Sequence, residues 1–132
     1  MAYLSPLQAM SDFLADNWND TKVCYPNAPE PDLVGENHWL QIWLFTTTQQ
    51  TTLGATNRVT EQGTFWLDIV SEQDTGLIKH IELCSKLAKL FQVAYVNGVS
   101  MQGAYIDPQQ GYNAEGRYVM RVKLDYVLDY EY

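Results

Sequence analysis

The chain has 132 residues, the usual size of one domain and enough to enclose one hydrophobic core. Eight Lys and Arg residues stand against sixteen Asp and Glu residues, which gives a formal net charge of −8. This acidic balance repels nucleic-acid phosphates and anionic membranes, so it argues against sequence-independent DNA binding. Residues 1–7 lack the pattern of a signal peptide and no stretch approaches the length of a membrane span, so a cytoplasmic protein is expected.

The first half of the chain predicts one helix and three strands. Ser5-Pro6 is a good helix start, and Leu7, Met10, Phe13 and Leu14 form an apolar stripe that extends to about Asn17. A short β-prone run at 22–25 precedes a Pro-rich loop that extends to about Asn37. The stretch 38–47 is apolar on both alternating faces and predicts a central strand, and 64–70 predicts its hairpin partner.

The second half predicts a helix followed by two strands. Asp74 or Thr75 can cap a helix with an apolar stripe at helical spacing, while three lysines fall on its wet side or near its end. The stripe consists of Leu77, Ile81, Cys84, Ala88 and Phe91, reinforced by Leu87 and Leu90. A turn at Asn97-Gly98 precedes a strand at 99–106, and strict alternation from Tyr118 to Tyr130 predicts a long last strand.

This order of elements predicts one α+β domain that spans residues 1–132. The expected architecture is one mainly antiparallel sheet with two helices packed on one face. The polar stretch 46–58, which contains Thr46–Thr52 and Gly54, has no apolar periodicity and is expected to be a flexible hairpin loop.

The sequence offers little material for catalysis, and we expect no enzyme, no catalytic residue, no cofactor and no metal. It contains no Gly-x-Ser-x-Gly elbow, no Gly-rich phosphate loop and no His-Glu-x-x-His pair. A zinc site made of Cys24, His38, His80 and Cys84 is the sharpest alternative, but the ligands lie far apart in sequence, and the two cysteines are more simply explained as reduced, largely buried thiols. The acidic residues Asp125, Asp129 and Glu131 are interpreted as a solvated edge of the last strand.

The aromatic residues point to an interaction surface. If helices cover the sheet face that holds Phe65, Leu67 and Ile69, then Trp66 and one set of aromatic side chains from 39–45 lie on the opposite face. Such a face is covered either by a partner or by the chain's own loops at 25–37 or 46–58, and the two alternatives stay open here. Stacking of sugar rings is a third, weaker interpretation.

The Thr/Gln stretch has two interpretations as well: a mobile spacer, or a β-prone arm that becomes ordered on a neighbouring subunit. Its low charge and many β-branched residues favour the arm. We therefore predict an assembly interface that consists of Trp39, Trp43, Trp66, Thr48, Gln49, Gln50, Thr51, Thr52 and Arg58.

Over nearly its whole length the chain resembles the tail-terminator family of tailed bacteriophages. The resemblance rests on the order and spacing of several segments and not on one diagnostic motif. These are Trp18 after a first helix, Tyr25–Asn27 with Pro29, the strand 39–42, a long hairpin, the segment 63–69, Gly76 before a helix with 87–91, and a long alternating last strand. The tyrosine-rich acidic end at 125–132 is not part of it.

This resemblance implies a structural virion protein without catalytic residues. It implies a homohexameric ring that ends growth of the tail tube, binds the major tail-tube protein on one side and faces a head-completion or connector protein on the other. DNA passes through such a ring without sequence-specific recognition. The expected location is the host cytoplasm during assembly and then the virion tail. The alternatives are a neighbouring neck or tail-completion protein of similar fold, and a small enzyme or ligand-binding protein that uses the aromatic surface.

Overall fold

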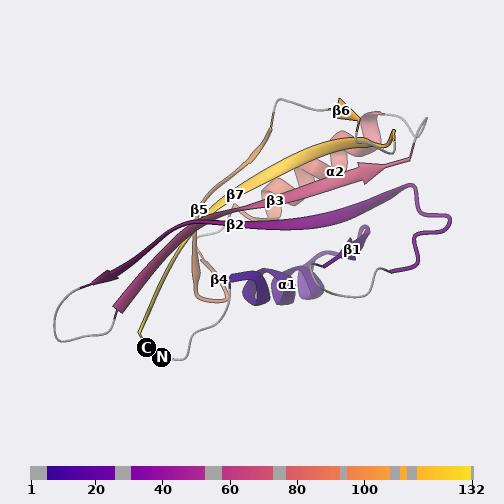
Figure 1. Ribbon diagram of the computed structural model, residues 1–132. Helices are drawn as coiled ribbons and strands as arrows, with labels where there is room; N and C mark the ends of the chain where they lie inside the picture. The colour runs from indigo at the N-terminus through magenta and orange to yellow at the C-terminus, as the bar shows by residue number, and fades with distance from the viewer. Residues whose placement is uncertain are drawn as a thin grey trace.

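The computed structural model describes residues 6–25, 31–52, 58–72, 77–92, 95–107, 111–112 and 116–131. Two helices and seven strands lie within these ranges (Figure 1). Their bounds are α1 Pro6–Asn17, β1 Lys22–Cys24, β2 His38–Thr52, β3 Arg58–Ser71, α2 Leu77–Leu90, β4 Tyr95–Val96, β5 Val99–Ile106, β6 Gly111–Tyr112 and β7 Tyr118–Glu131. None of the described helices is long and apolar enough to cross a membrane.

All described strands belong to one sheet in the order β1-β2-β3-β7-β5-β4, with β6 paired to β7 off this path. The short β1 runs parallel to β2, and every other pairing is antiparallel. The prediction of a mixed α+β fold with a mainly antiparallel sheet is therefore confirmed.

The core lies on one face of the sheet, which we call the inner face. Leu40, Phe65, Leu67, Ile69 and Val122 alternate onto this face and are fully buried. Both helices contribute to the same hydrophobic cluster. Their buried members are Ala9, Met10 and Leu14 of α1 with Leu83, Cys84, Leu87 and Ala88 of α2.

The buried side of α2 differs from the predicted stripe in its first turns. Leu77 and Ile81 were expected in the core but are exposed, as is Ile78 between them. His80 and Leu83, which are not members of the predicted stripe, are buried instead. Positions 77, 81, 84 and 88 fit a helical period as well as positions 80, 83, 84 and 87 do. The helix is rotated so that the second set, which includes His80, faces the sheet.

The long central hairpin corrects the prediction of a loop at 46–58. β2 continues to Thr52 and β3 begins at Arg58, so residues 46–52 pair with 58–63 and only 53–57 connect the strands. Residues 53–57 lie outside the described part of the chain. The strand continues because β-branched Thr residues suit an extended backbone even without an apolar face. Figure 1 shows this end of the hairpin reaching beyond both helices.

Two short strands, β4 and β6, were not predicted. β4 and β5 form a hairpin whose turn, Asn97-Gly98, has φ angles of 47° and 89°. Positive φ at both positions is the requirement of the tight hairpin turn that Asn-Gly favours. The side-chain amide of Asn97 also donates a hydrogen bond to the Ala9 carbonyl at 2.9 Å, so the turn is tied to α1.

Candidate interaction surface

The sheet face opposite the core, the outer face, carries a cluster of aromatic side chains. Trp43 on β2 and Trp66 on β3 are direct register partners, and the Phe45 ring lies 4.4 Å from the Trp66 ring. Trp43 is 49% exposed and Phe45 is 41% exposed. The prediction that Trp66 lies with one set of aromatic side chains from 39–45 on the face opposite Phe65 is confirmed. We call Trp43, Phe45 and Trp66 the aromatic strip.

Two basic side chains of β7 border the aromatic strip. The Arg121 guanidinium lies 3.8 Å from the centre of the Trp66 ring and binds both carboxylate oxygens of Asp68, at 2.7 and 3.1 Å. These hydrogen bonds, more than any other cause, raise the pKa of Arg121. Lys123 lies 5.3 Å from the same ring and 3.1 Å from Asp107. Both cations are thus held by carboxylates and lie within cation–π distance of the Trp66 ring.

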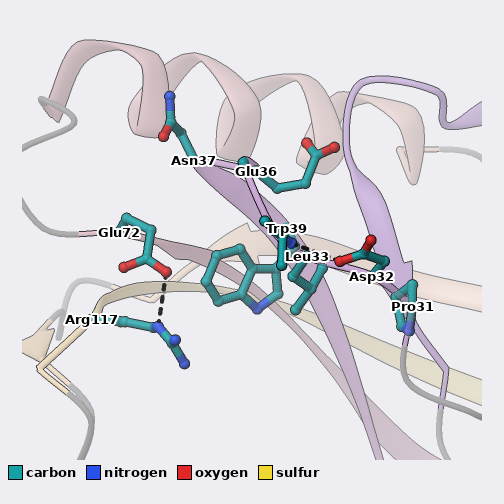
Figure 2. A pocket seen from close by; sticks show the side chains of 10 residues that line it. Pro31, Asp32, Leu33, Glu36, Asn37, Trp39, Glu72 and Arg117 are labelled. Carbon is teal, nitrogen blue, oxygen red and sulfur yellow. Dashed lines mark hydrogen bonds and ion pairs between the residues drawn. The ribbon is translucent and has the colours of Figure 1, made fainter.

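Trp39 also lies on the outer face, but unlike Trp43 and Phe45 it is buried. It is only 2% exposed and lies against a recess of about 560 Å³ (Figure 2). Arg117 lies 5.1 Å from the Trp39 ring and pairs with Glu72 at 3.2 Å. The loop 31–37 and Arg117 line the recess. Loop cover therefore accounts for Trp39, whereas in the described part of the chain Trp43 and Phe45 remain open to solvent.

The remaining predicted interface residues lie on the extended part of the hairpin. The backbones of Thr48, Gln49, Gln50, Thr51 and Thr52 are in β2, and Arg58 begins β3 as the register partner of Thr52. Their side chains lie outside what the structure describes. β7 pairs with the same part of β3, with Arg58 opposite Glu131, so this end of the sheet is a three-stranded ribbon. We call residues 46–52, 58–62 and 127–131 the arm.

A line of irregularities crosses the sheet where the arm leaves the body. The register shifts between Thr46 and Thr48 on β2, and again between Met101 and Gly103 on β5. Gly63 of β3 lies between these bulges, opposite Tyr126 of β7. Bulges bend and twist strands locally, so these positions account for the change of direction that Figure 1 shows.

A polar cluster lies at the other end of the inner face, where Ser71 and His80 are buried and His38 and Tyr118 are half-buried. His38, Ser71 and Tyr118 are neighbours across β2, β3 and β7, and His80 of α2 packs on them. Ser71 Oγ lies 2.8 Å from His80 Nδ1, and the two histidine rings are 5.8 Å apart. Burial lowers the pKa of both histidines. The zinc alternative had grouped His38 with His80, but no pattern in the sequence indicated Ser71 or Tyr118 as their neighbours.

The alternative zinc ligands do not converge in the structure. Among the described residues, no group of three or more His, Cys, Asp or Glu side chains is placed to hold a metal ion. His38 and His80 are neighbours, but Cys84 faces the Met120 carbonyl in the core. Neither Cys24 nor Cys84 is in a disulfide.

The carboxylates of β7 have structural partners on the neighbouring strand. Asp125 accepts a hydrogen bond from Thr64 Oγ1 at 3.0 Å, and Asp129 accepts one from Thr60 Oγ1 at 2.5 Å. Both residues lie on the outer face, as the alternation of the last strand predicted. The side chain of Glu131 is not among those described.

Comparisons with known proteins support the fold alone. No protein-family model and no curated protein matches the chain. Fifteen chains of solved structures are similar to it. One of them, whose name states no function, is 15% identical, covers 91% of this chain and 87% of its own length, and has a TM-score of 0.61. The α+β arrangement described above thus occurs in another protein of similar size.

Proposed function

We propose that this chain is a non-enzymatic structural subunit of a bacteriophage tail, which forms a ring on the end of the tail tube, stops its polymerisation and joins it to the head. In this proposal both helices cover the inner face of the sheet, which leaves the outer face for partners. The partners are further copies in a homohexamer, the major tail-tube protein and a head-completion protein.

The observation that carries the proposal is the aromatic strip. Large aromatic side chains and arginine are the residue types enriched in the parts of protein interfaces that contribute most to binding. Trp43 and Phe45 lie beside Trp66, whose ring contacts Arg121 and Lys123, and these two cations are already paired with Asp68 and Asp107. A protein partner that buries the rings needs no additional charge, whereas an enzyme requires converging groups with suitable pKa values.

The arm and the net charge support the same proposal. A three-stranded ribbon that extends beyond the helices offers backbone hydrogen-bonding groups to a neighbour. A net charge of −8 suits a ring through which DNA passes, because an acidic wall repels phosphates and does not retain them.

The decisive experiment deletes the gene from the phage that encodes it and images the lysate by electron microscopy. Abnormally long tails without heads, restored to normal length by the gene on a plasmid, are expected. Tails of normal length joined to heads would refute a terminator, and tails of normal length without heads would favour a neighbouring neck or tail-completion protein. Purified virions should contain the chain, as mass spectrometry can establish.

A further inference from the structure

We infer that the two open edges of the sheet bind each other in neighbouring copies of this chain, with β2 of one copy running antiparallel to β5 of the next. This inference rests on the proposed function, because it specifies the contact that builds the ring. Its basis is the topology of the sheet and the side chains that lie at each edge.

Both edges of the sheet are open beyond the short strands that pair with them. β1 pairs with β2 only at 39–41, so the described part of the chain leaves the outer side of β2 without a strand from Ile42 onward. β4 pairs with β5 only at 99–100, so in the described part of the chain the side of 101–106 that faces away from β7 has no neighbouring strand. Native proteins protect edge strands with charges or proline, yet residues 42–52 contain neither.

The strand directions suit a continuous sheet. β2 is antiparallel to β3, β3 to β7, and β7 to β5. A strand added beside β5 must therefore run antiparallel to it. β2 is itself antiparallel to β5 in direction, so β2 of a second copy fits there when both copies have the same orientation. Because two different edges meet, the contact is head to tail, which is the kind of contact that builds rings.

The side chains at the two edges match on the outer face. One register row crosses the sheet through Trp43, Trp66, Lys123 and Tyr105. Trp43 stands at the β2 edge and Tyr105, 48% exposed, stands at the β5 edge. Joining the edges places the Tyr105 ring of one copy beside the Trp43 ring of the next, a cross-strand aromatic pair that buries both.

The inner face matches as well. One row runs from Leu44 to Ala104 and the next from Ile42 to Ile106, so aliphatic side chains end both rows at both edges. Leu44, Ala104 and Ile106 are only partly buried and pack against the core cluster. The joined sheet would therefore continue the core between copies. A slip of one residue would reverse both faces, so the pattern selects the register.

Cross-linking between single-cysteine variants tests this contact directly. In a Cys24→Ser background, Phe45→Cys marks the β2 edge and Gln102→Cys marks the β5 edge, while Trp43 and Tyr105 stay intact. Cys84 remains, since burial raises the pKa of its thiol to about 12. A short bismaleimide is added at high protein concentration, where even a transient contact is trapped. Ser85→Cys, at an exposed position of α2, serves as the control.

The mixture of the two edge variants should yield dimers linked from position 45 to position 102, whereas each variant alone should yield none above the Ser85→Cys control. Adding Tyr105→Lys should lower the yield of these dimers about tenfold or more, as expected for an interface anchor. Links between two identical positions, or no dimers above the control, would overturn the inference.

The outcome is separable from that of the gene deletion. If the gene with Tyr105→Lys restores tails of normal length although this substitution abolishes the cross-link, the terminator proposal stands. The edge contact is then not the contact that builds the ring. If the edges cross-link but deletion leaves tails normal, the chain assembles edge to edge in another structure.

Discussion

The Tyr126 side chain lies across the backbone of Gly63 and donates a hydrogen bond to the buried carboxylate of Glu61 at 3.1 Å. A Cβ atom at Gly63 would lie 2.4 Å from the Phe45 carbonyl oxygen and 2.6 Å from two atoms of Tyr126. Glycine is therefore required where the tyrosine crosses the strand. The arrangement fixes β2, β3 and β7 to one another at the start of the arm.

Gly63→Ala should destabilise the fold by about 1–3 kcal/mol, because a close-packed site must shift both a backbone carbonyl and a ring. Urea unfolding followed by fluorescence measures the change. Gly111→Ala is the matched control, since a Cβ there meets no atom within 4 Å. Equal stability of the two variants would show that the Gly63 site relaxes freely.

Tyr126→Phe should cost about 1–3 kcal/mol, because it removes a hydrogen bond donated to a buried carboxylate while the ring stays in place. The same unfolding measurement tests this. Tyr105→Phe, at an exposed position, should change the free energy of unfolding by less than about 0.5 kcal/mol. A Tyr126→Phe loss no larger than this control would mean that the Tyr126 hydroxyl contributes nothing to stability.

Trp39→Ala and Trp43→Ala should separate a core tryptophan from an interface tryptophan on the same strand. Trp39 is almost fully buried, so its loss should cost about 3–5 kcal/mol. Trp43 is half exposed, and its loss should cost roughly 1 kcal/mol in the monomer. Urea unfolding of monomer at low concentration gives both values. Similar losses would contradict the distinction between the covered and the open part of the outer face.

Stability should fall as the pH is lowered from about 7.5 to 5.5. The folded pKa values of His38 and His80 lie below the ordinary 6.5, so the unfolded chain takes up protons first as the pH falls through that value. The stability present above pH 6.5 is then lost as the pH falls toward the folded pKa values. The slope is at most about 1.4 kcal/mol per pH unit for each histidine.

Urea unfolding at several pH values within this window measures the slope. His38→Gln should make this slope shallower, since one of the two titrating groups is gone. If the wild-type chain instead became more stable as the pH fell, the histidines would be stabilised in their charged form.

Cys84 should resist alkylation in the folded protein. Burial, together with the nearby Asp68 charge, raises the pKa of its thiol to about 12, so the reactive thiolate is scarce at neutral pH. Mass spectrometry after brief treatment with N-ethylmaleimide should find the label on Cys24, which is only partly buried, long before Cys84. Equal labelling of both thiols would indicate that α2 opens readily from the sheet.

The sequence by itself determined the elements whose patterns repeat over many residues. Strict alternation defined β7 and its polar face, helical spacing defined α1 and α2, and Asn97-Gly98 marked a tight turn. Alternation also placed Trp43 and Trp66 on the face opposite Phe65, because neighbouring side chains of a strand point to opposite faces.

Only the tertiary structure decided which members of these patterns are buried. The rotation of α2 sets His80 in the core and leaves Leu77 and Ile81 exposed, since several helical faces were nearly equally apolar. Loop cover separates Trp39 from Trp43, and contacts across strands bring Gly63, Tyr126 and Glu61 together from distant parts of the chain. The polar Thr46–Thr52 run carried no periodic signal, and it is a strand because β3 supplies the hydrogen-bonding partner that its own sequence does not specify.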